Sequence, residues 1–461
     1  MSAGTARCGL VAASLLSFLV AAGPARTDGG PAGTWELHYA RREVETRLAD
    51  TQADSPEAGS GRSEPTVSTA PMIVRLESSR LAIRVESAET IYDFDEKAIY
   101  YLEHQARLVA RYALHSDIGF RVAEYRNRLV LGRALEQARI AGAPFDPVAV
   151  AIGLSIDPDG VGGTVEQRSE GSSMVFLAGG QETARVAFAD RACPAALRAA
   201  LRRFLVYGCR LHPDARRRII ETGRIPRTLT YRVHDSFRDL VVHLELRDIR
   251  SGAAAIGIPA DYSPPQPDTP LDALLVRMEQ GQAGDCPGAE VYAERSTAYE
   301  ASGSFADAFL TLIEMSLSTG ADVSGRIRGL LNRHADDPRL REVREAVTDP
   351  STDPGERLER YAAVDRDGLD MAWLLGVFEA NWHTEQGDVD EARRLFLAAL
   401  GRNPCLAGVY KDLGDIEYRR YEVPTAWRYW DVARRIAPDH PMLEGIAEYE
   451  RTLESAYPEF F

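Results

Sequence analysis

The chain has few cysteines and no long hydrophobic run in its interior. Five cysteines occur among 461 residues, and none forms a Cys-x-x-Cys pair, so the spacing of a structural zinc site is missing. Beyond the N-terminus, no stretch approaches the roughly 18 consecutive apolar residues of a membrane-spanning helix. Basic residues are also outnumbered, with 54 Lys and Arg against 69 Asp and Glu and a formal charge of −15. This balance argues against a general nucleic-acid binder, which would present a basic face.

Recognisable catalytic motifs are missing as well. The sequence contains no His-Glu-x-x-His, no Gly-x-Ser-x-Gly and no phosphate-binding Gly-Lys-Ser/Thr, the patterns of zinc proteases, serine hydrolases and nucleotide-binding loops. His234 and His243 flank a pair of predicted strands, and Asp93 and Asp95 share a predicted hairpin. Packing histidines and a solvated turn explain these residues without a metal. We therefore expect no enzymatic activity, metal or cofactor; the alternative is a hydrolase whose catalytic residues lie within residues 115–225 without a known motif.

The first 25 residues have the pattern of a secretory signal peptide. Arg7 precedes an apolar run from Leu10 to Val20, and small residues at 21–25 follow, as at a signal-peptidase site. The prediction is a periplasmic or secreted protein of a didermic bacterium whose mature chain begins near residue 26. An uncleaved N-terminal anchor is the alternative.

Four cysteines follow the predicted signal peptide, an even number that permits disulfides in an exported chain. Cys193 and Cys209 bracket one helical segment, and we predict that they pair. The other two are Cys286 and Cys405. Buried free thiols are the alternative, because a domain of this size does not need disulfides to fold.

Short runs of alternating apolar and polar residues predict an antiparallel meander early in the chain. Alternation of apolar and polar residues over four to eight positions is typical of strands with one face in water. The predicted strands are 35–39, 72–76, 81–85, 90–94, 98–102 and 107–112, with later ones at 148–154, 174–177, 184–188, 228–233 and 240–246. Helical spacing predicts helices at 120–140 and at 194–223, the second broken at Gly208 and Pro213.

Over residues 35–262 this succession resembles the curved antiparallel half-barrel of periplasmic lipoprotein carriers. The resemblance rests on Tyr92-Asp93-Phe94, Ala98 to Tyr101, Leu244 to Leu246 and the closing Ile258 to Tyr262. It implies a sheet that wraps partly around one or two helices and leaves an apolar hollow for acyl chains. A lipid or other apolar ligand in that hollow is therefore one expected partner.

One basic concentration stands out in this acidic chain. It consists of Arg198, Arg202, Arg203, Arg210 and residues 216–218. Such a group is suited to an anionic lipid head group or an acidic partner. A solvated helical face with acids nearby is the alternative.

Two segments near the end of the chain repeat at an offset of 34 residues. Small, aromatic, small and proline positions recur: Ala392, Phe396, Ala399 and Pro404 return as Ala426, Trp430, Ala433 and Pro438. Such a period is typical of helix–turn–helix arrays that bury their core between neighbouring repeats. Alanine lets two helices approach closely, an aromatic ring fills the space beside it, and proline ends the helix.

Tyr410 to Gly414, together with the turn at Gly387, makes this region resemble tetratricopeptide repeats. The resemblance implies an inner groove that binds a protein or peptide, lined by Asn381, Lys411, Asp415 and Tyr418. In some such domains, Asn and Lys hold a peptide's terminal carboxylate. Asp415 stands where a further donor is wanted, and its charge would repel that carboxylate.

The combined prediction is an α+β protein in four parts. These are a signal peptide at 1–25, a half-barrel-like domain with a helical insert at 26–262, a proline-rich linker with the first helical residues at 263–284, and a tetratricopeptide-like domain at 285–461. The expected function is non-enzymatic protein–protein interaction as a scaffold or adaptor in the cell envelope. The alternative is a carrier or sensor that binds an apolar ligand in the N-terminal domain. Neither nucleic acid nor a transmembrane segment beyond the signal peptide is expected.

Overall fold

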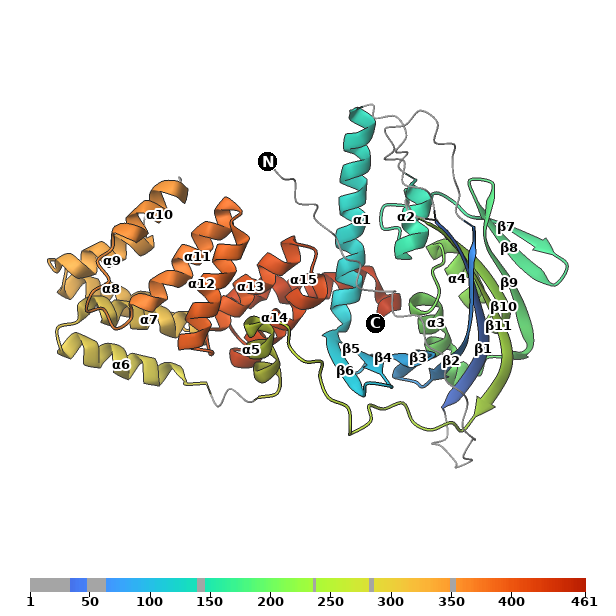
Figure 1. Ribbon diagram of the computed structural model, residues 1–461, viewed down its shortest axis with the longest axis horizontal. Helices are drawn as coiled ribbons and strands as arrows, with labels where there is room; N and C mark the ends of the chain where they lie inside the picture. The colour runs from blue at the N-terminus through green and yellow to red at the C-terminus, as the bar shows by residue number, and fades with distance from the viewer. Residues whose placement is uncertain (1–33, 48–63, 139–145, 235–237, 282–285, 349–353) are drawn as a thin grey trace.

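The computed structural model describes residues 34–47, 64–138, 146–234, 238–281, 286–348 and 354–461. The predicted signal peptide at 1–25 lies outside these ranges. The chain is an α+β protein, with an open antiparallel sheet of eleven strands in the N-terminal half and a succession of helices in the C-terminal half (Figure 1). This confirms the fold class predicted from the sequence.

The sheet runs in the order β6-β5-β4-β3-β2-β1-β11-β10-β9-β8-β7, and each neighbouring pair is antiparallel. The strands are β1 Trp35–Arg47, β2 Thr66–Leu76, β3 Arg80–Val85, β4 Ala88–Asp93, β5 Ala98–Glu103, β6 Leu108–Ala113, β7 Glu166–Glu170, β8 Ser173–Ala178, β9 Gln181–Ala192, β10 Arg224–His234 and β11 Arg238–Ser251. All six runs predicted between residues 35 and 112 form strands.

The inner face of the sheet is covered by helices. The sheet curves around α3 (Arg198–Tyr207) and α4 (Pro213–Glu221) (Figure 1). Apolar side chains from β1, β2 and β8 to β11 share one core with those of α3 and α4. Phe204 of α3 is fully buried and stacks on Tyr39 of β1, with 5.8 Å between ring centroids. The concave face therefore packs against the protein's own side chains.

Residues 148–154 were predicted as a strand and form a helix instead, α2 (Pro147–Leu154). The Asp146 carboxylate accepts hydrogen bonds from the backbone N–H groups of Val148 and Ala149, and Pro147 occupies the first turn. These are the two commonest signals for a helix start. The periodicity of a short apolar run does not distinguish a buried strand from a buried helix. Here the N-cap at Asp146 is the local feature that favours the helix. Residues 166–170, where the sequence predicts no strand, form β7.

The C-terminal half is built largely of helices joined by short turns. They are α5 Pro270–Glu279, α6 Ala289–Ala301, α7 Phe305–Thr319, α8 Ser324–Arg333, α9 Pro338–Thr348, α10 Pro354–Ala363, α11 Leu375–Gln386, α12 Val389–Arg402, α13 Ala407–Arg419, α14 Val423–Ile436 and α15 Glu444–Ala456, with the short helices η2 Ala372–Leu374, η3 Pro441–Leu443 and η4 Pro458–Phe460. Within the described ranges, no helix is long and apolar enough to cross a bilayer.

The repeated positions lie where helices meet. Helices α12 and α14 start 34 residues apart, at 389 and 423, and the small and aromatic positions noted in each are buried. Gly414 of α13 shows how close the packing is, because a Cβ there would lie 2.3 Å from the Trp430 ring of α14. Glycine is thus required at this position by the neighbouring indole.

Helix α1 (Leu114–Gln137) stands between the two halves (Figure 1). Its residues Ile118, Val122 and Tyr125 belong to the same apolar cluster as the C-terminal helices. Gly119 lies directly against an α14 ring: a Cβ there would approach Trp427 to 2.6 Å. The two halves therefore share a packed interface in addition to the segment at 263–269, which contains no helix or strand beyond a single bridge between Leu108 and Ser263.

The disulfide joins Cys286 and Cys405, 119 residues apart. The predicted pair is corrected, because Cys193 and Cys209 are both buried free thiols. Burial raises the pKa of the Cys209 thiol to about 12, which disfavours the reactive thiolate. Proximity along one helical segment did not bring these two sulfurs together, whereas the disulfide ties the start of α6 to the α12–α13 turn.

Candidate functional site

Three of the four predicted groove residues meet around a carboxylate that the prediction did not include. Asn381 lies on α11, and Lys411 and Asp415 lie on α13. The Lys411 ammonium donates to Asp415 at 2.7 Å and lies 3.6 Å from Asp412. The Asn381 side chain is a polar neighbour of Asp412 and acts to lower the pKa of its carboxyl. We call Asn381, Lys411, Asp412 and Asp415 the α11–α13 cluster.

Burial and charge set the protonation of this cluster. Burial raises the pKa of Asp412 to about 6; the charge of Asp415 adds to the rise, while Lys411 and Asn381 oppose it. Burial acts to lower the pKa of Lys411, but the hydrogen bond to Asp415 and the nearby carboxylates outweigh it and raise that pKa. Lys411 is therefore cationic at neutral pH. With both carboxylates ionised, the cluster carries a net charge of about −1.

Tyr418, the fourth predicted residue, lies outside the cluster. Its hydroxyl is 3.1 Å from that of Tyr449 on α15, and its ring is tilted against Trp430 at 5.6 Å. The Trp430 indole N–H lies 3.2 Å from an Asp415 oxygen and 3.3 Å from the Lys411 carbonyl. Trp430 thus links this aromatic packing to the cluster and holds Asp415 in place.

The α11–α13 cluster does not match a site for a terminal carboxylate. The Lys411 ammonium already has two carboxylate neighbours, so it offers little net attraction to a third anion. Asp412 was the residue that sequence reasoning missed. The available signal was a second acid next to Lys411 on the same helix.

Part of the basic concentration is engaged within the protein. Arg216 is almost fully buried, donates to the Ser155 carbonyl at 2.8 Å and pairs with Glu459 at 3.0 Å. Arg217 pairs with Asp214, and Arg203 lies over the Phe94 ring. Arg198, Arg202 and Arg210 are exposed, so these contacts bury only part of the basic concentration.

The residues considered for a metal have other roles. Asp93 is buried, pairs with Arg80 and accepts from the backbone N–H groups of Asp95 and Glu96, so it shapes the hairpin. His243 faces Thr230 in the strand register, four positions away from His234. In the part of the chain that the structure describes, no group of three or more His, Cys, Asp or Glu side chains is arranged to hold a metal ion.

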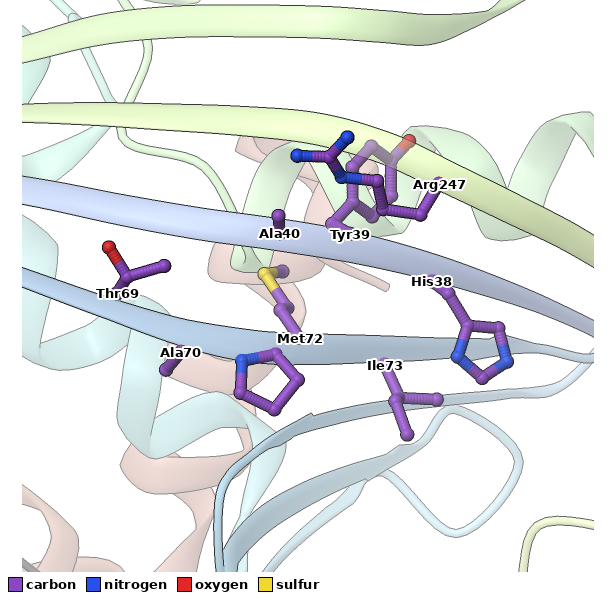
Figure 2. A pocket seen from close by; sticks show the side chains of 9 residues that line it. His38, Tyr39, Ala40, Thr69, Ala70, Met72, Ile73 and Arg247 are labelled. Atoms are coloured by element: carbon purple, nitrogen blue, oxygen red, sulfur yellow. The ribbon is translucent and has the colours of Figure 1, made fainter. Parts of the chain in front are cut away.

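A pocket of about 300 Å³ lies on the sheet at β1, β2 and β11. Strand β1 shifts register against β11 between His38 and Tyr39. Thr69 lies toward one end of the pocket, and His38 and Arg247 lie toward the other (Figure 2). Most of the remaining lining is apolar: Tyr39, Ala40, Ala70, Pro71, Met72 and Ile73.

Comparison with known proteins assigns no family. No protein-family model matches the chain, and no curated protein matches it. Among solved structures, a similarity is found to lipovitellin, in a structure described as showing lipid–protein interactions, with 10% sequence identity and a TM-score of 0.19. It covers 90% of this chain and 57% of the lipovitellin chain, so this chain spans little more than half the length of that protein. A TM-score of 0.19 carries no argument about fold or function.

Proposed function

We propose that the helical half is a docking surface for a partner protein, and that the α11–α13 cluster binds a positively charged segment of that partner. The observation that carries the proposal is the meeting of Asp412 and Asp415 around one lysine on a face shared by two helices. The 34-residue offset and the resemblance to tetratricopeptide repeats support the same role. On this proposal the protein has no enzymatic activity and acts as an adaptor in the cell envelope.

The cluster suits a cation for electrostatic reasons. Asp415 is about one-third exposed and Asp412 one-sixth, so each offers an acceptor to a side chain that approaches from solvent. An incoming lysine or arginine would neutralise the net negative charge and would favour ionised Asp412. Hydrogen bonds between ionised groups are about twice as strong as neutral ones.

Titration calorimetry with two peptides tests the proposal on the full chain. One ten-residue peptide carries two lysines, and the second peptide has the same sequence with two glutamates in their place. We expect saturable binding of the lysine peptide only. Asp415→Asn should weaken it at least about fivefold, as loss of one charged contact does.

Asp336→Asn is the matched control, because Asp336 is an exposed carboxylate in the α8–α9 turn, outside the cluster. Equal loss of affinity in Asp415→Asn and Asp336→Asn would mean that only the net charge of the protein matters, which would contradict a specific site. Tighter binding of the glutamate peptide would refute the proposed chemistry.

A second candidate is binding of an apolar ligand by the N-terminal half, favoured by the apolar lining of the β1–β2–β11 pocket. Its volume is at the lower limit of small-molecule sites, enough for part of an acyl chain. A native mass spectrum of protein purified from its own host should then show a retained ligand, and Ala40→Leu should abolish it by filling the pocket. Retention that survives this substitution would place the ligand elsewhere, and a ligand-free mass would refute the candidate.

Export is part of the proposal. The intact mass of the protein from its own host should correspond to a chain that begins near residue 26. A full-length mass, or recovery in the cytoplasmic fraction, would contradict an exported protein.

A further inference from the structure

A short segment after α15 lies against helices of the N-terminal half. Residues 457–461 include η4, and Phe460 is completely buried. The Phe460 ring meets Tyr207 of α3 edge-on, with 5.6 Å between centroids. The Phe461 ring lies 5.0 Å from the ring of His115 on α1. We call residues 457–461 the tail segment.

Main-chain atoms of the tail segment are recognised directly. The Tyr207 hydroxyl donates to the Phe460 carbonyl at 2.6 Å. The Arg203 guanidinium donates to the main-chain oxygen of Phe461 at 2.7 Å. Both donors lie on α3. Because they bond to main-chain oxygens, these contacts do not depend on which side chains the tail segment carries.

Two arginines contact the side chains of the tail segment. Arg216 of α4 pairs with Glu459 at 3.0 Å. Its guanidinium lies 5.7 Å from the centre of the Phe460 ring, and that of Arg121 on α1 lies 5.2 Å from it. Arginine within about 6 Å of an aromatic ring is attracted to its π face.

This arrangement differs from ordinary apolar packing. Burying an arginine is costly unless it is paired and hydrogen-bonded, yet Arg216 is buried here with the tail carboxylate of Glu459 as its ion-pair partner. Buried aromatic anchors, charged pairs and donors to the peptide backbone are the components of a peptide-recognition site. The site itself belongs to the N-terminal half, and the tail segment follows α15.

We propose that α1, α3 and α4 form a binding site for a Glu-Phe-containing peptide, which the chain's own tail segment occupies. The covalent link gives the tail a high effective concentration and keeps the site filled. When the tail is weakened, the same sequence from a second copy of this chain, or a free peptide of that sequence, binds in its place. This site is distinct from the α11–α13 cluster.

Fluorescence polarisation with a labelled peptide Tyr-Pro-Glu-Phe-Phe tests the proposal on the full chain. The wild-type protein should bind weakly, because its own tail competes. Phe460→Ala should bind the peptide at least tenfold more tightly. A peptide with alanine in place of its first phenylalanine should not bind.

A second released variant keeps the test decisive if Phe460→Ala fails to fold. Glu459→Gln removes the ion pair with Arg216 without adding a positive charge. Arg216 keeps its hydrogen bond to the Ser155 carbonyl and Glu459 is one-third exposed, so the fold should persist. In this background, Arg203→Ala should weaken peptide binding, whereas Arg202→Ala, an exposed neighbour on the same helix, should not. The proposal is overturned if a folded released variant binds the peptide no more tightly than the wild type, or binds the alanine peptide equally well.

Discussion

Replacing Trp430 by alanine tests the packing of the helical half. The ring is buried, fits over Gly414 of α13 and lies 4.9 Å from the Trp427 ring. Deleting a buried tryptophan side chain costs about 3–5 kcal/mol. The lost indole N–H also leaves Asp415 without one of its donors. We therefore expect the free energy of unfolding to fall by about 4 kcal/mol.

Equilibrium urea denaturation followed by far-ultraviolet circular dichroism measures this loss. Trp430→Phe is the matched control, because it keeps an aromatic ring at this position while removing the N–H donor and the rest of the five-membered ring; its cost should be smaller, about 1–2 kcal/mol. A Trp430→Ala protein that unfolds within about 1 kcal/mol of the wild type would refute the packing described for α13 and α14.

Three further perturbations test other parts of the structure. Replacing Cys286 and Cys405 by serine should cost about 2–5 kcal/mol, because the crosslink closes a long loop; unchanged unfolding under reducing conditions would contradict it. Gly119→Ala should destabilise the contact between the halves by about 1–3 kcal/mol, since the new methyl would overlap an α14 indole. Gly153→Ala is the control: its Cβ would have open space, so this variant should be neutral or stabilising. Melting followed by circular dichroism compares the two variants. Lys411→Ala should tighten binding of the lysine peptide in calorimetry, because it leaves two carboxylates uncompensated; weaker binding would mean that Lys411 itself contacts the partner.

Much of the fold could be predicted from local sequence patterns. The strands between residues 66 and 113 alternate apolar and polar side chains, and pairing between neighbours in sequence leaves few other arrangements. The helix at 147–154 was missed because its run is uniformly apolar and its cap lies just outside it. The pairing of β1 with β11 joins residues some 200 apart, and no local pattern encodes it.

In the candidate sites, too, local patterns placed some residues, whereas the long-range contacts could not be predicted. A repeat offset was enough to place Asn381 and Lys411 on neighbouring helices, but the role of Asp412 depends on how α11 and α13 pack. The site of the tail segment is assembled from three helices of the other half, far away in sequence. The disulfide likewise joins two turns 119 residues apart. Long-range contacts of this kind follow from tertiary packing, which residue spacing in one sequence does not specify.

The pH dependence of lysine-peptide binding tests the proposed docking chemistry most directly. Burial raises the pKa of Asp412 to about 6, so the proton must leave before a cation is bound well. Affinity in calorimetry should therefore rise as pH increases from 5 to 7.5, by at most tenfold per pH unit below the pKa. In Asp412→Asn the rise should disappear. Binding that is independent of pH in the wild type, or equally pH-dependent in Asp412→Asn, would contradict the account.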